Sequence, residues 1–409
     1  MDLFKKYIDN FILFFLFTGI VSLFTECLMT PKTISAIMLY FFLIYKHLVL
    51  KEKFPSGAKK SLLILLFLFF VSLCLSAIFS EMPLYSFEWI KKSYWVSIPL
   101  GLAVLSIGYK KNVFKIILLA FITVFILNNL HFYLKAVKEC HTWDLFSKTF
   151  IPDRNYTFYL GLLLPFALSS LLVFNNLIFR CFLILNIFFS LAFLFPIGSR
   201  GAFVTIFLEI ILWIIFVSFL MWKNNKKIII TGWIVLLLGF SFLAYKYHSH
   251  PMVKGAIKRR LSPNGRNIII KDRFFLVLKH RPVLGIGYGR LLYFNFLEKY
   301  HVPKRCGRYD SKEKRFIYYS DEGIFLQTII RQGLIGALIF ILLFLYSLKE
   351  AFLKCLKTKI FIEKGMFFAI FSVLIAHYFI RGLVETLSLT YFVFFIFIIA
   401  IPLSNKDNK

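Results

Sequence analysis

The chain has 409 residues, of which 59% are hydrophobic and 53 are phenylalanine, and its formal net charge is +29. A soluble domain could not bury so much apolar surface, so the composition predicts a polytopic helical membrane protein. Long continuous apolar runs argue against an outer-membrane barrel, whose strands alternate. Because the lysines and arginines flank these runs, the positive charge indicates contact with membrane lipids and not with nucleic acid.

Twelve apolar runs approach the ~20 residues that a helix needs to cross a bilayer. We therefore expect an all-α fold of about twelve transmembrane helices. The runs lie at 11–29, 34–45, 61–80, 94–108, 113–134, 156–174, 180–197, 201–221, 228–244, 323–347, 366–380 and 387–404.

Short basic segments precede the first run and follow every second run, as the positive-inside rule predicts for cytoplasmic loops. Both termini are therefore expected in the cytoplasm. The predicted organisation is nine transmembrane helices in 1–244, a large periplasmic loop in 245–322, and three helices with a cytoplasmic tail in 323–409. The basic segments include Lys5, Lys46, Lys59, Lys110, Arg180, Lys226, Lys354 and Lys406.

The long loop is rich in lysine and arginine, which loops of this length tolerate outside the cytoplasm. Helical spacing predicts a short helix over Asp272–Lys279, ended by Arg281-Pro282. A flexible turn is then expected at 285–289, where three glycines alternate with Ile286 and Tyr288. This run lacks the flanking strand and helix of a dinucleotide site, so it predicts no nucleotide.

Arg200 stands between two apolar runs with almost no loop between them. An arginine this close to hydrocarbon costs about a few kcal/mol unless it snorkels, pairs or lines a wet cavity. It is either a snorkelling interfacial residue or a cation aimed into an outward-facing cavity. We favour the cavity, because Gly198 and Gly201 allow the backbone or a substrate to approach closely.

Three more arginines fall on the same predicted outer face: Arg154 before a span, Arg273 on the short loop helix, and Arg381 near a helix end. The planar guanidinium matches two phosphate oxygens at once, so arginines converging on one face suit a pyrophosphate. Arg381 and Glu385 form either a structural ion pair or part of this site.

Asp321 and Glu322 open the tenth run. They either cap that helix by satisfying its first amides or supply a general base beside a cationic cavity. The histidines of the loop have no metal-ligand spacing, so no metal site is expected.

In their order and topology these pieces resemble the bacterial O-antigen ligases and the related O-antigen polymerases, inner-membrane glycosyltransferases of lipopolysaccharide biosynthesis. The resemblance covers nearly the whole chain through short motifs separated by a large periplasmic loop. These motifs are Gly198–Gly201, Arg273 followed by 280–289, and the run from Leu326 to Gly336.

The resemblance implies that Arg200 and Arg273 are the family's two essential arginines, and that Glu322 stands where the ligases have a histidine. It implies a glycan donor on undecaprenyl pyrophosphate, a lipid A–core acceptor, an active site facing the periplasm, and no cofactor. The residues expected to support substrate binding are Arg154, Arg381, Glu385 and Asp321.

Two alternatives accompany this expectation. An O-antigen polymerase would extend the lipid-linked glycan instead of transferring it to lipid A–core. A transporter of lipid-linked glycan would belong to another class, and it should show inverted repeats and charges buried in mid-span. Neither feature is evident in the sequence.

Overall fold

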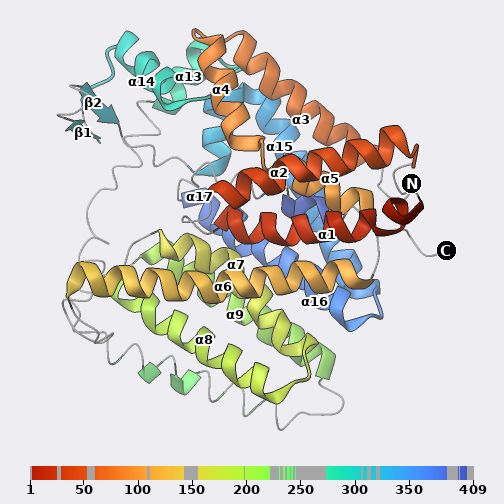
Figure 1. Cartoon of the computed structure of the whole chain (residues 1–409). Helices are drawn as coiled ribbons and strands as arrows, with labels where there is room; N and C mark the ends of the chain where they lie inside the picture. The colour runs from red at the N-terminus through yellow and green to blue at the C-terminus, as the bar shows by residue number, and fades with distance from the viewer. Residues whose placement is uncertain are drawn as a thin grey trace.

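The computed structural model describes residues 2–24, 29–52, 60–107, 111–141, 155–197, 199–221, 273–304, 307–310, 315–318, 323–384 and 397–402, with a few residues between 230 and 245 and at 395. Over these residues the protein is an all-α polytopic membrane protein with one small hairpin (Figure 1).

The membrane helices are followed in the chain by two short helices and two strands, and then by a second helical group. The first group comprises α1 (Asp2–Phe24), α2 (Met29–Ile44), the π-helix η1 (Tyr45–Val49), α3 (Lys60–Ile78), α4 (Pro83–Tyr94), α5 (Ser97–Ile107), α6 (Lys111–Cys140), α7 (Tyr156–Val173), α8 (Leu177–Ile197) and α9 (Arg200–Met221). Next come α13 (Phe275–His280), α14 (Arg290–Lys299), β1 (Gly307–Asp310), β2 (Arg315–Tyr318), α15 (Ile324–Lys357), α16 (Phe361–Ser372), the π-helix η4 (Val373–Arg381) and α17 (Gly382–Val384).

Among the described residues, 7 helices are long and apolar enough to cross a membrane. Three shorter apolar helices accompany them, at Tyr7–Leu23, Leu63–Ile78 and Ser97–Ile107. These helices coincide with ten of the twelve predicted spans. The ninth and twelfth predicted spans, 228–244 and 387–404, fall mostly outside the described residues.

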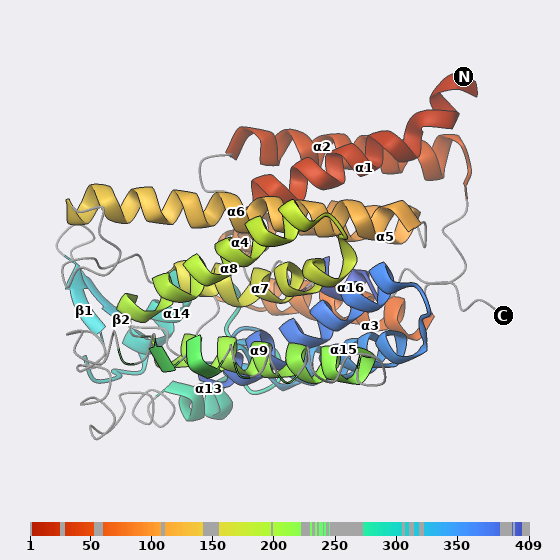
Figure 2. The same cartoon turned by 90° about the horizontal axis from the view of Figure 1, so that it is seen from below.

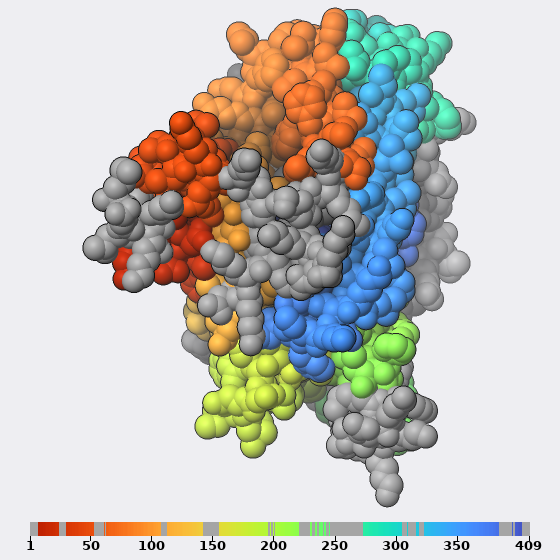
Figure 3. Space-filling model, turned by 90° about the vertical axis from the view of Figure 1, so that its right-hand side faces the viewer, coloured from red at the N-terminus to blue at the C-terminus, as the bar shows by residue number. Residues whose placement is uncertain are grey.

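The helices run along one shared direction (Figures 1 and 2). One end of the bundle carries α13, α14, β1 and β2, and we call it the loop end; α1 begins at the other end. The Lys354 ammonium, in the last turn of α15, donates to the carbonyl of Pro402, so the last described residues lie at the end where α1 begins. Figure 3 looks onto that end, with α1 and α2 in red, α3 in orange and α15 in blue.

Helix α7 lies at the centre of the lower half of the bundle in Figure 1, because it packs against α6, α8, α9, α16 and η4. Phenylalanines fill these interfaces. Phe121 stacks on Phe166 with ring centroids 4.0 Å apart, and Phe216 stacks on Phe368 at 4.1 Å. Aromatic pairs of this kind add dispersion contacts that helices in lipid need, since burying apolar surface there yields little.

The segment before the predicted fourth span, to which no apolar run was assigned, is helical. Pro83 opens α4, as proline does at a first helical turn, and α5 is then only 11 residues long. The apolar run had been assigned from Tyr94 onward, but Tyr94 belongs to α4 and is buried. The loop end also contains a β-hairpin that the all-α expectation missed, in which Arg308 pairs with Ile317 and Tyr309 with Phe316.

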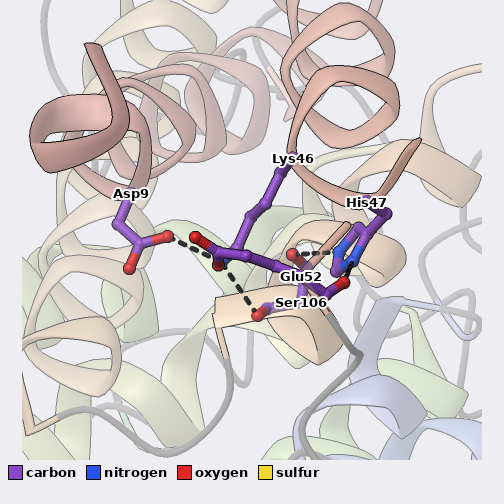
Figure 4. Close-up of polar contacts among 5 residues, drawn as sticks. All are labelled: Asp9, Lys46, His47, Glu52 and Ser106. Carbon is purple, nitrogen blue, oxygen red and sulfur yellow. Dashed lines mark hydrogen bonds and ion pairs between the residues drawn. The ribbon is translucent and has the colours of Figure 1, made fainter. Parts of the chain in front are cut away.

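A polar cluster joins α1, η1 and α5 at the end opposite the loop end (Figure 4). The buried Lys46 ammonium lies 2.7 Å from Asp9 Oδ1, donates to the Ser106 carbonyl at 3.2 Å, and lies 3.8 Å from Glu52 Oε2. The His47 ring nitrogens contact the Glu52 carbonyl and the Ser106 hydroxyl, each at 2.7 Å. Because a buried ammonium needs compensation, this cluster fixes how the three helices meet.

Asp9→Ala should destabilise the protein more than Lys46→Met. The first change leaves a buried ammonium without its nearest carboxylate and should cost about 2–3 kcal/mol. The second removes the charge and retains much of the apolar stem. Thermal unfolding in detergent, followed by tryptophan fluorescence, measures both. Equal midpoints for the two variants would contradict the charge-compensation argument.

Candidate functional site

Arg381 is the most enclosed cation of the described bundle, with an exposed fraction of 0%. It ends η4, and its guanidinium donates from Nη1 to the Thr157 carbonyl at 2.6 Å and from Nη2 to the Thr157 hydroxyl at 2.7 Å. Its Cζ lies 3.9 Å from the ring centroid of Phe158. The first turn of α7 therefore holds the planar fork in one orientation.

Two ionisable residues lie beneath Arg381 inside the membrane helices. Glu209 of α9 and His377 of η4 are both completely buried, and each lies near enough to Arg381 to interact with its charge. The Glu209 carboxylate accepts no hydrogen bond from the described residues. Since ionisable groups at this depth are expensive unless compensated, the charge of Arg381 acts directly on the buried Glu209 carboxyl group.

Close helix packing brings these groups together. A Cβ on Gly161 of α7 would lie 2.8 Å from His377 Nδ1 and 3.4 Å from Thr205 Cγ2 of α9. Further along, Trp213 Nε1 of α9 donates to the Leu168 carbonyl of α7 at 3.0 Å. Glycine at 161 thus permits α7, α9 and η4 to meet at one level.

The start of α15 joins the same place. A Cβ on Gly323 would lie 2.2 Å from the carbonyl oxygen of Gly382, the residue that follows Arg381. Helices α7, α9 and α15 all contact η4. Thr157 lies in the first turn of α7 and Gly323 just before α15, whereas Thr205 lies in the second turn of α9. The amino-terminal ends of α7 and α15 and the second turn of α9 are therefore the parts of these helices that lie close to η4 and Arg381. We call this place the Arg381 junction; backbone dipoles there favour an anion.

Arg200 is the first residue of α9, so its backbone lies one turn before Thr205. Its side chain lies outside the described part of the structure. The Ser199 hydroxyl next to it is buried and forms no hydrogen bond with the described residues. The prediction that Arg200 stands between two apolar helices with almost no loop is confirmed, because α8 ends at Ile197 and α9 begins at Arg200. Its role remains a prediction.

The structure places Arg273 elsewhere. Its side chain is 1% exposed, donates from Nη1 to the Tyr293 hydroxyl at 3.3 Å, and lies 5.2 Å from the ring centroid of Tyr318. These partners belong to α14 and β2, within a small apolar core of the loop end that includes Val277 and Phe294. Arg273 is therefore not brought beside Arg381, and the expected pairing of Arg200 with Arg273 at one phosphate site does not follow.

The other predicted site residues are next to described ones in the sequence. Arg154 precedes Asn155, Asp321 and Glu322 precede Gly323, and Glu385 follows Val384. Arg154, Asp321, Glu322 and Glu385 lie outside the described residues.

Residues 285–289, expected as a flexible turn, are held in place by α15. Gly285, Gly287 and Gly289 have φ values of 68°, 95° and 124°, which favour glycine. Helix α15 is interrupted at Gly333, where φ is 69° and ψ is −169°. The two irregular segments face each other, since a Cβ on Gly285 would lie 2.6 Å from the nitrogen of Gly333.

Four backbone groups beside the break in α15 bond to residues 282–289, which we call the glycine segment. Carbonyls that would accept bonds within a regular helix accept them from the glycine segment instead. The amides just beyond the break donate to carbonyls at the start of the glycine segment. The bonds are Ile286 N to Ile330 O at 2.9 Å, Gly287 N to Arg331 O at 3.1 Å, Leu334 N to Pro282 O at 2.8 Å, and Ile335 N to Val283 O at 3.4 Å.

Buried side chains join the contact between the glycine segment and α15 to helix α3. Gln332 Nε2 donates to the Tyr288 hydroxyl at 2.6 Å, and the Ser72 hydroxyl donates to Gln332 Oε1 at 2.9 Å. The Ser76 hydroxyl donates to the Arg331 carbonyl, and the Arg331 guanidinium lies 5.4 Å from the Tyr288 ring centroid. The glycine segment is therefore a structural lock that positions the start of α15.

Glu209, His377 and Thr157 were not among the residues predicted from the sequence. A usable signal was present for the first two, because an ionisable residue within an apolar run is a functional candidate by default. Buried mid-span charges were not evident in the sequence, and the structure shows two buried ionisable residues within the membrane helices, Glu209 and His377. Thr157 carried no such signal, since only its contact with Arg381 distinguishes it from other threonines.

No protein-family model matches the chain, and no curated protein is similar to it.

Proposed function

We propose that this protein is a glycosyltransferase of the O-antigen ligase type. It moves a glycan from undecaprenyl pyrophosphate to a sugar hydroxyl of lipid A–core, on the periplasmic side of the bacterial inner membrane. The observation that supports this most is the Arg381 junction, where a fully buried guanidinium lies at the starts of α7 and α15 and near α9. Such a place suits the pyrophosphate of a lipid-linked donor.

In the proposed reaction the acceptor hydroxyl oxygen attacks the anomeric carbon of the donor sugar. The bond from that carbon to the pyrophosphate oxygen breaks, and undecaprenyl pyrophosphate leaves as an anion. Arg381, Arg200 and the helix amino-terminal ends stabilise the charge that develops on it. Glu322 takes the proton of the acceptor hydroxyl. The next residue, Gly323, packs on Gly382, so the backbone that follows Glu322 lies close to the backbone of Arg381.

This proposal assigns supporting roles to the remaining predicted residues. We assign Arg154, Asp321 and Glu385 to substrate binding because of their sequence neighbours: Arg154 precedes the α7 turn that holds Arg381, Asp321 precedes Gly323, and Glu385 follows α17. Arg273 acts differently, by holding Tyr293 and Tyr318 in the loop end. The scheme uses no nucleotide, because the lipid-linked donor already carries its leaving group, and the arginines neutralise that pyrophosphate in place of a metal.

The proposed topology is twelve spans with both termini in the cytoplasm and a periplasmic loop over 245–322. A reporter fused near Arg290 of α14 should then behave as periplasmic.

A transporter of lipid-linked glycan is the second candidate, and one observation favours it. Glu209 and His377 are completely buried within membrane helices, as coupling residues of transporters commonly are. A polymerase would use the same donor and leaving group as a ligase, with a lipid-linked glycan as acceptor.

Deletion of the gene, read on a lipopolysaccharide gel, separates the three. For a ligase we expect bare core, with polymerised glycan accumulating on the lipid carrier. Core bearing a single repeat unit would indicate a polymerase. Transfer by the purified full chain, from an undecaprenyl-pyrophosphate glycan to lipid A–core in detergent, tests the chemistry directly. A chain that moves the donor across vesicles without transferring it would be a transporter, and the transferase proposal would be wrong.

A further inference from the structure

A pocket of about 550 Å³ opens at the loop end between α14 and the β1–β2 hairpin. None of its lining residues belongs to the Arg381 junction. Its volume falls within the range of small-molecule sites. The lining consists of Glu298, His301, Val302, Lys304, Tyr309, Phe316 and Tyr318.

Three aromatic rings and three hydrogen-bonding side chains share this pocket. Tyr309 is 64% exposed, Phe316 is half-buried, and Tyr318 is buried behind them. Such rings present flat apolar faces with a polar edge, which suits the C–H face of a sugar ring. Glu298, His301 and Lys304 are exposed at the same place, where a carboxylate, an imidazole and an ammonium can each bond hydroxyls.

The buried wall of the pocket is held rigidly from behind. The Tyr318 hydroxyl donates to the Val302 carbonyl at 3.0 Å, and the Arg273 guanidinium lies against the Tyr318 ring. Burial, and next the Glu298 carboxylate, raise the pKa of the Tyr318 phenol, so it stays a neutral donor at physiological pH. A wall that is ordered before a ligand arrives lowers the entropy cost of binding.

We propose that this pocket is a saccharide subsite, which holds a sugar ring of one of the two glycans that the transferase joins. The ring lies on Tyr309 and Phe316, and its hydroxyls bond Glu298, His301 and Lys304. This inference rests on the proposed function, and it gives Arg273 the part of a positioning residue for Tyr318. The donor glycan and the lipid A–core share this chemistry, so the experiment separates them.

Isothermal titration of the purified full chain in detergent tests the subsite with two probes. One is the core oligosaccharide released from lipopolysaccharide by mild acid, and the other is the O-glycan released in the same way. Tyr309→Ala and Glu298→Gln should each weaken binding of one probe or both by about tenfold. Both residues are exposed, so the variants should fold, and thermal unfolding checks this. The matched control is Phe275→Ala, which removes an exposed aromatic ring on α13 outside the pocket.

The probe that loses affinity identifies the glycan, and either result supports the subsite. Parental affinity in both variants, an equal loss in Phe275→Ala, or no binding of either probe to the parent chain overturns it. Transfer activity separates the two proposals. If Tyr309→Ala transfers glycan with an unchanged acceptor KM and binds both probes as the parent chain does, only the subsite proposal is refuted. If binding depends on Tyr309 but the parent chain transfers no glycan, only the proposed function is refuted.

Discussion

Replacing Arg381 by leucine is expected to lower the free energy of unfolding by about 3–5 kcal/mol. The change removes both hydrogen bonds to Thr157, leaves those buried acceptors without their donor, and takes away the cation whose charge acts on the buried Glu209. Thermal unfolding in detergent is the measurement. A midpoint equal to that of the parent chain would show that the buried guanidinium contributes nothing to stability.

Two further variants separate stability from chemistry. The double change Arg381→Leu with Glu209→Leu removes both buried ionisable groups and should be more stable than Arg381→Leu alone, because no buried carboxyl group without a hydrogen-bond partner remains. It should nonetheless lose transfer by about 100-fold or more, since the leaving pyrophosphate has lost its guanidinium. Arg381→Lys keeps the charge without the planar fork and should fold, but it cannot form both bonds to Thr157. Full transfer by the double variant would exclude Arg381 from the reaction.

Gly333→Ala should destabilise the protein by about 3 kcal/mol or more. At this position φ is 69°, and a Cβ would lie 2.1 Å from the Val283 carbonyl oxygen. The new methyl group would push the glycine segment away from α15 and break the four backbone bonds that join them. Thermal unfolding and the yield of folded protein both report the effect.

The matched control for this change is Gly239→Ala. A Cβ on Gly239 meets no atom within 4 Å, and its φ is not in the left-handed region. The same glycine-to-alanine change should therefore be neutral or slightly stabilising there. Equal midpoints for the two variants would refute the lock between the glycine segment and α15.

The membrane helices were predictable because their requirement is local. A helix in lipid needs a long apolar run, and ten of the twelve predicted runs coincide with an apolar helix of the structure. Their ends were less predictable. Helix α6 continues to Cys140 and α15 to Lys357, since each helix extends past the apolar core into polar sequence. The stop at Arg281-Pro282 was predicted correctly, because proline acts on its immediate neighbours.

The candidate site was only partly predictable. Arg381 was recognised as one cation among several on the outer face, but nothing in its neighbourhood indicates that Thr157, more than 200 residues earlier, receives its guanidinium. Arg273 had the same apparent status, yet it lies in a separate core against Tyr293 and Tyr318. Residues this far apart in sequence are related by helix packing, which a one-dimensional pattern does not contain.

The glycines show most clearly which features the local sequence predicts and which only the tertiary packing decides. Three alternating glycines in 285–289 were enough to predict irregular backbone, since glycine alone accepts positive φ readily. Their partner is a break in α15 at Gly333, inside a run that reads as continuous helix. Each irregular segment leaves amides and carbonyls without partners of its own, and the two segments bond each other through these groups. Composition and local pattern thus specified a basic, polytopic, helical membrane protein. Long-range packing selected which charges meet at Arg381 and which glycines close on α15, because buried polar groups must find partners wherever the fold brings them.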